Sequence, residues 1–446
     1  MASKTKMNSS IPIIDSLMRR QQRRSLPIFA IVLVLIFAEA TQTQAQLTYA
    51  TNADNTLTVT GYTGSDASVV IPSVTNGLTV TEIGYKAFFY DTGITSVSMP
   101  DTIAVIGQSA FEYCLNMTNV NISSGLTNLG EAAFDECKLS SVTLPGTILN
   151  MGDLVFNECF SLTNAILLPG ITNISGQMFS SCWSLTSVVI PSSVTDIGSD
   201  AFGGTGLSEI AIPGSVANIE GGAFQGSGLT NAMLSNGVVN IGDQAFEDCY
   251  NLTEVSLPSS LATIGYGAFA NCANITEITL STNVTSIGDL AFYGCESLTN
   301  AIISGRVPSL SYGMFYDCYG LRAVFCQGNA PSISSQQGDP SSGVFQEDTN
   351  VTVYYLPGTT GWSNTYQSVP AVEWNPAVAP ASVHNGQCGF TVTGNTNIPI
   401  QLQACTNLTS PVWTLLTNVN LTNGSFYYSE PVQSNSPSRF YRVVFP

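Results

Sequence analysis

The stretch Ile264–Ser286 reads IGYGAFANCANITEITLSTNVTS, and the residues on either side of it repeat the same pattern. IGDQAFEDCYNLTE precedes it and IGDLAFYGCESLTN follows it, so one unit of 22 or 23 residues recurs with different polar residues. Repetition at this period is typical of a solenoid, in which each unit forms one coil. The Phe of the AF pair marks the coils at positions 88, 111, 134, 156, 179, 202, 224, 246, 269, 292 and 315.

Each unit predicts two extended segments and one turn. In LTEVSLP, Leu252–Pro258, apolar residues face one side of a predicted β-strand, and the Pro ends it because it has no N–H to donate. Leu261–Ile264 forms a second extended segment, after which IGxxAF returns the chain. Asp153, Asp243 and Asp289 precede a Phe by three residues, where a carboxylate can cap a short helical turn. We therefore expect a β-rich solenoid with short helical turns and a parallel sheet on one face, held together by stacking of neighbouring units.

The composition excludes one class of partner. Only 9% of the 446 residues are charged, and the formal net charge is −18. From residue 41 onward there are 28 acidic and six basic residues. Such a surface repels phosphate backbones, so we expect no nucleic-acid binding.

The first 45 residues predict a secretory signal peptide. RRQQRR is followed by an uncharged run, Ser25–Ala38, and then by the small-residue pattern of Ala38-Glu39-Ala40. The run has 14 residues, fewer than the roughly 20 that a membrane-spanning helix needs. We expect cleavage after Ala40 or Ala45, and we expect the chain to contact a membrane only through this peptide before cleavage. An uncleaved N-terminal anchor is the alternative.

The repeated pattern IGxxAFxxCxxLTxVxLPxxVTx resembles the BspA-like leucine-rich repeat of bacterial surface proteins over about residues 80 to 320. The resemblance implies a leucine-rich repeat solenoid in an exported, surface-displayed protein that binds macromolecules. The chain departs from ordinary leucine-rich repeats, which carry an Asn or Cys after LxxLxL. At that place this sequence has PSSL or PGSV, so the usual Asn ladder is absent.

Three further segments complete the expected domain organisation. Residues 46–374 form the solenoid with atypical units at both ends, since an exposed end would be an adhesive sheet edge. Residues 375–380, with the sequence NPAVAP, form a linker. In residues 381–446 several β-rich segments alternate with Asn, Gly, Ser and Pro, which predicts a small β-sandwich.

Most of the eleven cysteines recur at one position of the repeat, three residues after the Phe. Identical positions stack in a column, and we favour buried free thiols there. Disulfides between neighbouring coils are an alternative, and a metal site is disfavoured because no His accompanies the column. The column contains Cys114, Cys137, Cys159, Cys182, Cys249, Cys272, Cys295 and Cys318.

Cys388 and Cys405 stand apart from this column, in the predicted small domain. A disulfide between them would close a loop and stabilise the domain by about 3 kcal/mol. A bridge and two free thiols remain equal alternatives for this pair.

The outward side chains of the predicted sheet suggest a binding surface. The four consecutive members from Ile166 to Met233 are apolar on a face otherwise rich in Ser, Thr and Asn, which is typical of an interaction site. Trp183 and Ser187 border them in the sequence, and we include Ser187 and Glu209 with the four apolar residues in the expected binding site. Ordinary hydrophobic strand residues are the alternative interpretation. The outward column runs Ser98, Asn121, Thr143, Ile166, Val189, Ala211, Met233, Ser256, Thr279, Ile302 and Phe325.

Catalytic and metal sites have weak support. Glu254 and Glu277 occupy equivalent outward positions in adjacent units, which would place them about 5 Å apart. That separation is near the one used by retaining glycosidases, and stacked Glu also suits a weak calcium site, but solvated acids are the favoured interpretation. His384 is the single His, so we expect no catalytic residue, no cofactor and no metal centre.

These observations favour a secreted or cell-surface scaffold that binds an extracellular protein or a glycan through the open face of the solenoid. A self-associating surface-layer component is the second hypothesis. A glycan-active enzyme is a distant third.

Overall fold

The computed structural model describes residues 46–334, 343–346, 348, 350–432 and 438–444. The predicted signal peptide, residues 1–45, lies outside the described residues. All surfaces discussed below lie in one compact unit, Tyr49–Gly61 together with Ser65–Pro446. Within the described part of the chain, no helix has the length and hydropathy needed to cross a bilayer.

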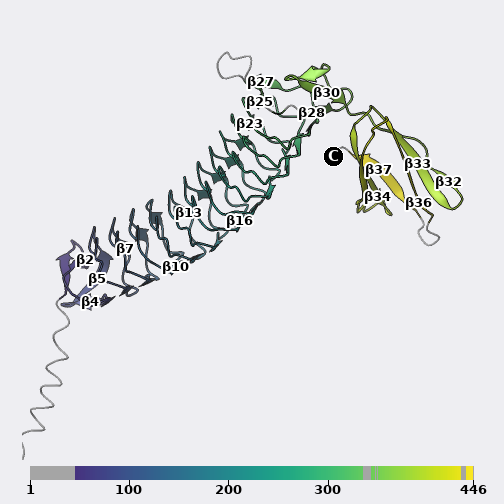
Figure 1. The fold of residues 1–446 in the computed structure, drawn as a ribbon. Helices are drawn as coiled ribbons and strands as arrows, with labels where there is room; N and C mark the ends of the chain where they lie inside the picture. The colour runs from purple at the N-terminus through teal and green to yellow at the C-terminus, as the bar shows by residue number, and fades with distance from the viewer. Residues whose placement is uncertain (1–45, 335–342, 347, 349, 433–437, 445–446) are drawn as a thin grey trace, which may run out of the picture. The chain divides into compact units, whose positions relative to one another are not determined.

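The solenoid is confirmed, and its stacked coils are seen from β2 to β30 in Figure 1. We call the LTxVxL segment of each coil its A-strand. Neighbouring A-strands pair in parallel, and the series is interrupted three times. The first two of the four resulting sheets contain β3 Ser68–Val70, β6 Ser96–Ser98 and β8 Asn119–Asn121, and then β10 Ser141–Leu144, β12 Asn164–Leu167 and β14 Ser187–Val189. The third sheet contains β16 Glu209–Ile212, β18 Asn231–Leu234 and β20 Glu254–Ser256. The fourth sheet contains β22 Glu277–Thr279, β24 Asn300–Ile303, β26 Ala323–Cys326, β28 Thr352–Tyr355, β30 Val369–Glu373 and the antiparallel β29 Thr365–Tyr366.

A second series of parallel strands, which we call B-strands, precedes the turn at each Phe. Most B-strands have two residues, and they also form separate sheets. The first sheet contains β1 Leu47–Thr51, β2 Leu57–Tyr62, β5 Leu78–Ile83 with the antiparallel β4 Val74–Thr75, β7 Val105–Ile106, β9 Asn128–Leu129 and β11 Asn150–Met151. The others contain β13 Asn173–Ile174, β15 Asp196–Ile197, β17 Asn218–Ile219, β19 Asn240–Ile241, β21 Thr263–Ile264 and β23 Ser286–Ile287; and β25 Ser309–Ser311 and β27 Ser332–Ser334.

The Phe residues of the AF pairs form a continuous stack through the core. Each ring is at most 2% exposed. Neighbouring ring centroids lie 4.8 to 5.9 Å apart, and the ring planes differ by at most 18°. The stack continues to Phe345 in the atypical last coil, 6.0 Å from Phe315. Each coil therefore completes the core of its neighbours, which a single unit could not form alone.

The turns around these Phe residues are not helical, so the expected short helical turns are wrong for the described residues. The residues two before and two after each Phe have left-handed backbone, with φ between 52° and 67°. At Phe134, the N–H groups of Ala132, Phe134 and Glu136 each donate to a carbonyl of the next coil at 2.9 Å. A helix would use these donors internally, and these bonds between coils offset the cost of left-handed residues other than Gly.

The aspartates expected to cap helical turns join neighbouring coils instead. The carboxylate of Asp243 accepts the N–H of Tyr266 in the next coil at 2.7 Å, and Asp153 and Asp289 do the same in their coils. Gly follows Ile in most coils because the coils approach closely there. A Cβ at Gly130 would lie 2.4 Å from the backbone nitrogen of Gln108.

The cysteine column contains buried free thiols, as expected. Each of its eight thiols donates to the carbonyl of the Phe in the preceding coil, at 3.1 to 3.3 Å. Burial raises the pKa of Cys182 to about 12 and that of Cys249 to about 11. These two thiols therefore stay protonated and unreactive near neutral pH.

Hydroxyl groups bond to carbonyls where ordinary leucine-rich repeats have their Asn ladder. Ser and Thr side chains just after the A-strands donate to a carbonyl of the preceding coil at 2.6 or 2.7 Å. These pairs are Thr102 to Val80, Thr147 to Leu126, Ser193 to Ile171 and Ser260 to Val238.

The C-terminal region is all-β with antiparallel sheets, as predicted. One sheet contains β31 Ala377–Val378, β32 Ser382–His384, β33 Gln387–Thr393 and β36 Ser425–Pro431, and the other contains β34 Pro399–Cys405, β35 Thr414–Asn420 and β37 Phe440–Val444. β31 falls within the segment expected to be a linker and pairs with β33. The hydrophobic core of the C-terminal region is continuous with side chains of the last coils, including Phe325 and Tyr354.

Candidate binding surface

The A-strands hold the predicted binding residues in register. Ile166 in β12 is aligned with Val189 in β14, and Ala211 in β16 is aligned with Met233 in β18. We call these four residues the apolar stripe. The two aligned pairs belong to different sheets, because the A-strand series is interrupted between β14 and β16. The stripe therefore crosses a sheet boundary.

All four side chains of the apolar stripe are exposed. Val189 is 72% exposed, Met233 47% and Ile166 44%. Their chain neighbours Ala165 and Ile210 point inward and are 1% and 2% exposed. The alternation along each A-strand thus separates core residues from stripe residues.

Small polar residues border the stripe on one side. Ser187 is aligned with Asn164, and Glu209 is aligned with Asn231. Ser187 and Glu209 are both exposed, as the sequence suggested. Glu209 carries the single charge in this border, so the stripe lies beside a weakly acidic edge.

An exposed aromatic pair lies on the same two coils as Ile166 and Val189. Phe160 and Trp183 are 42% and 66% exposed, and their ring centroids lie 4.7 Å apart with planes tilted by 34°. Of these two aromatic residues, the sequence predicts only Trp183 to border the stripe. Phe160 was missed, although both residues stand four positions after the Phe of their coil, and alignment of the repeats shows this.

Glu254 and Glu277 stand at equivalent positions of adjacent coils, but they do not share a strand ladder. Glu254 in β20 is aligned with Asn231, whereas Glu277 in β22 begins another sheet and is aligned with Asn300. The interruption between β20 and β22 separates them in the ladder. Both carboxylates nevertheless line one shallow depression of about 680 Å³, which also includes Met233 at the end of the stripe.

The cysteine and histidine residues considered from the sequence for a disulfide or for catalysis lie outside the apolar stripe. Cys388 and Cys405 are free thiols. They lie in β33 and β34, which belong to different sheets. His384 is exposed at the end of β32. Within the described ranges, no group of three or more His, Cys, Asp and Glu side chains is placed to hold a metal ion.

Further along the chain, the same outward column is covered. Phe325, aligned with Ile302 and Tyr354, is 1% exposed. These side chains belong to one core with Phe390 and Leu402 of the C-terminal region. The outward face of the A-strands therefore binds an apolar surface at one place within this chain.

Comparison with known proteins identifies a family whose model matches this chain. A family model described as the BspA type leucine rich repeat region, with six copies, matches residues 81–208 and 195–322, which together span more than half of the chain. No curated protein is similar enough to count as a match.

Several solved structures are similar to the chain. A leucine rich cell surface protein from Faecalibacterium prausnitzii is 26% identical, with a TM-score of 0.39 over 66% of this chain and 95% of that one. A leucine-rich repeat protein from Bacteroides ovatus is 22% identical, with a TM-score of 0.45 over 75% and 100%. The pneumococcal vaccine antigen PcpA is 22% identical, with a TM-score of 0.45 over 71% and 93%.

Proposed function

The chain belongs to the BspA-type leucine-rich repeat proteins, and we propose that it is an exported, non-catalytic surface protein that captures an extracellular protein. The contact is made by the apolar stripe together with Phe160 and Trp183. The observation that carries this proposal is the exposure of four consecutive apolar side chains in one column, the same column that packs against an apolar surface at Phe325.

The chemistry of the surface supports a partner with an apolar, positively bordered patch. The stripe contributes aliphatic area, and Phe160 and Trp183 contribute large aromatic side chains of the kind enriched at binding hot spots. On the A-strands from β12 to β22 the charged residues are Glu209, Glu254 and Glu277, which are all acidic. A protein with an apolar patch bordered by Lys or Arg is complementary to this surface.

The proposal is tested with a double variant, Val189→Asn with Met233→Asn, in residues 46–446. The matched control is Val70→Asn, because Val70 is 70% exposed and stands in the same column, aligned with Ser98. Partners are captured from solubilised extracellular matrix, identified by mass spectrometry, purified and measured by biolayer interferometry. We expect the double variant to lose at least about tenfold in affinity, equal to about 1.4 kcal/mol, and the control to retain it.

Two outcomes contradict the proposal. Capture by the double variant at the level of the control would show that the stripe is not the contact surface. A large loss of stability in the double variant would show that these side chains belong to the core. Sedimentation of the unmodified chain over a range of concentrations distinguishes a second copy of the chain from a different protein as the partner.

A further inference from the structure

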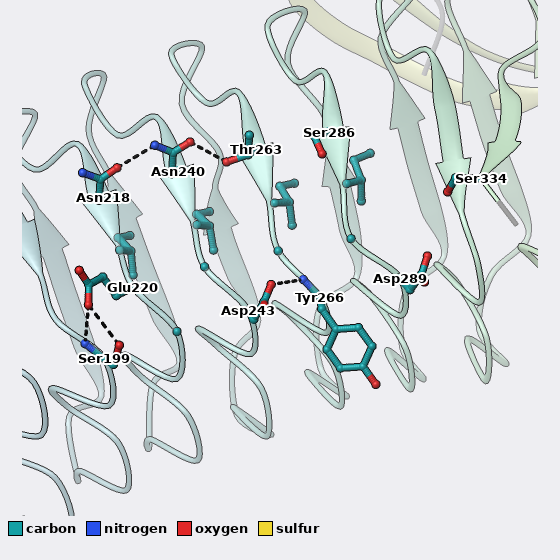
Figure 2. A pocket seen from close by; sticks show the side chains of 18 residues that line it. Ser199, Asn218, Glu220, Asn240, Asp243, Thr263, Tyr266, Ser286, Asp289 and Ser334 are labelled. Atoms are coloured by element: carbon teal, nitrogen blue, oxygen red, sulfur yellow. Dashed lines mark hydrogen bonds between the residues drawn. The ribbon is translucent and has the colours of Figure 1, made fainter. Parts of the chain in front are cut away.

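A second concave surface lies over the B-strands, away from the residues of the apolar stripe. This groove has a volume of about 910 Å³ and follows β17, β19, β21 and β23. Figure 2 shows two rows of side chains along it. One row contains Asn218, Asn240, Thr263 and Ser286, and the other contains Glu220, Asp243 and Asp289 with Tyr266 beside them.

The first row presents fixed amide groups. The amide of Asn240 donates to the side-chain oxygen of Asn218 at 2.7 Å, and Asn218 donates to Asp196 at 2.7 Å. The hydroxyl of Thr263 donates to the oxygen of Asn240 at 2.6 Å. An Asn amide has two N–H donors, so each of these amides keeps one for a ligand. Because neighbours already hold the side chains, binding costs little side-chain entropy.

The second row presents acceptors. One oxygen of Glu220 accepts the N–H and the hydroxyl of Ser199, both at 3.1 Å. One oxygen of Asp243 accepts the N–H of Tyr266 at 2.7 Å. The other oxygen of each carboxylate remains an acceptor for a ligand. The ring of Tyr266, 47% exposed, adds an apolar face beside them.

We propose that this groove binds a neutral polysaccharide chain. Sugar hydroxyls both donate and accept, so they match a row of amides facing a row of carboxylates. The side chains recur once per coil, at roughly the 4.8 Å spacing of parallel strands, which suits an extended polymer with its own repeat. No basic side chain is among the described residues lining the groove, and its carboxylates repel uronate or sulfate groups.

The groove is tested by affinity electrophoresis of residues 46–446 in native gels. The gels contain mannan, mixed-linkage β-glucan, xyloglucan or galactomannan as neutral probes, and polygalacturonate as the acidic probe. We expect retardation by at least one neutral polymer and none by polygalacturonate. Tyr266→Ala is expected to weaken the affinity at least tenfold, whereas Tyr266→Phe retains most of it. The control Tyr250→Ala removes a tyrosine that is 55% exposed outside the groove and leaves binding unchanged.

Failure of the groove proposal can be distinguished from failure of the protein-capture proposal, because different residues carry the two proposals. The double variant Val189→Asn with Met233→Asn is expected to bind the polymer as the unmodified chain does. The groove proposal is overturned if none of the four neutral polymers retards the chain, if polygalacturonate retards it as strongly, or if Tyr250→Ala weakens binding as much as Tyr266→Ala.

Discussion

The covered and the exposed parts of one column use the same strand geometry for different purposes. Ile302, Phe325 and Tyr354 stand at outward positions equivalent to those of Ile166 and Val189. At the covered end these positions are core, because the C-terminal region packs on them, and at the apolar stripe they are surface. Whether an outward apolar residue of the A-strands belongs to the core or to the surface therefore depends on what covers it.

Among the variants that test this comparison, we expect the largest loss of stability when the aromatic ring of Phe325 is removed at the covered end of the outward column. Phe325 is 1% exposed and stacks on Tyr354 with ring centroids 5.4 Å apart. We expect Phe325→Ala to lower the free energy of unfolding by about 3 to 5 kcal/mol. Urea unfolding followed by fluorescence measures this, because Trp374 reports on the same core. Met233→Ala, at an exposed position of the column, is the control, and equal losses in the two variants would contradict the distinction.

We expect a smaller loss of stability when a hydrogen bond at the covered end of the outward column is removed. The hydroxyl of Tyr354 donates to the carbonyl of Asn397 at 3.1 Å, and this bond joins the last coils to the C-terminal region. Tyr354→Phe keeps the ring and removes the donor, so we expect a loss of about 0.5 to 1.5 kcal/mol in the free energy of unfolding. An unchanged urea midpoint and slope would show that the bond does not contribute.

The smallest effect is expected at the stripe itself. Val189→Thr exchanges a methyl for a hydroxyl on a side chain that is 72% exposed, and we expect the free energy of unfolding to change by less than about 0.5 kcal/mol. The same exchange at Val324, which is 0% exposed, buries a hydroxyl and should cost about 1 to 3 kcal/mol. Thermal unfolding of both variants measures the contrast. A comparable loss at Val189 would place that residue in the core.

Repetition made the core predictable from the sequence. Any side chain that recurs at one position stacks on its own copies, so Phe134 and Cys137 could be assigned to buried columns without coordinates. The conformation of the turn was not predictable in the same way. Asp243 has the sequence environment of a helix cap, yet its carboxylate and the nearby N–H groups bond to the next coil, which no local pattern describes.

The candidate surfaces were predictable only in part. The apolar stripe followed from alternation along the A-strands, but covering of Phe325 depends on a region that begins some 50 residues later in the chain. The interruption between β20 and β22 places Glu254 and Glu277 in different strand ladders, although the sequences of their units look alike. The B-strand groove was missed because its Asn and Thr residues are ordinary polar residues until a ladder fixes them.

Because Ile166 and Ile302 occupy the same position in different coils, the interval between the apolar stripe and the covered end of the column is a whole number of coils. Each coil adds about 4.8 Å. Gene duplication or deletion of a single unit would lengthen or shorten this interval by one step while leaving both surfaces chemically unchanged. Relatives with different numbers of units would thus present the same exposed side chains at different distances from the C-terminal region.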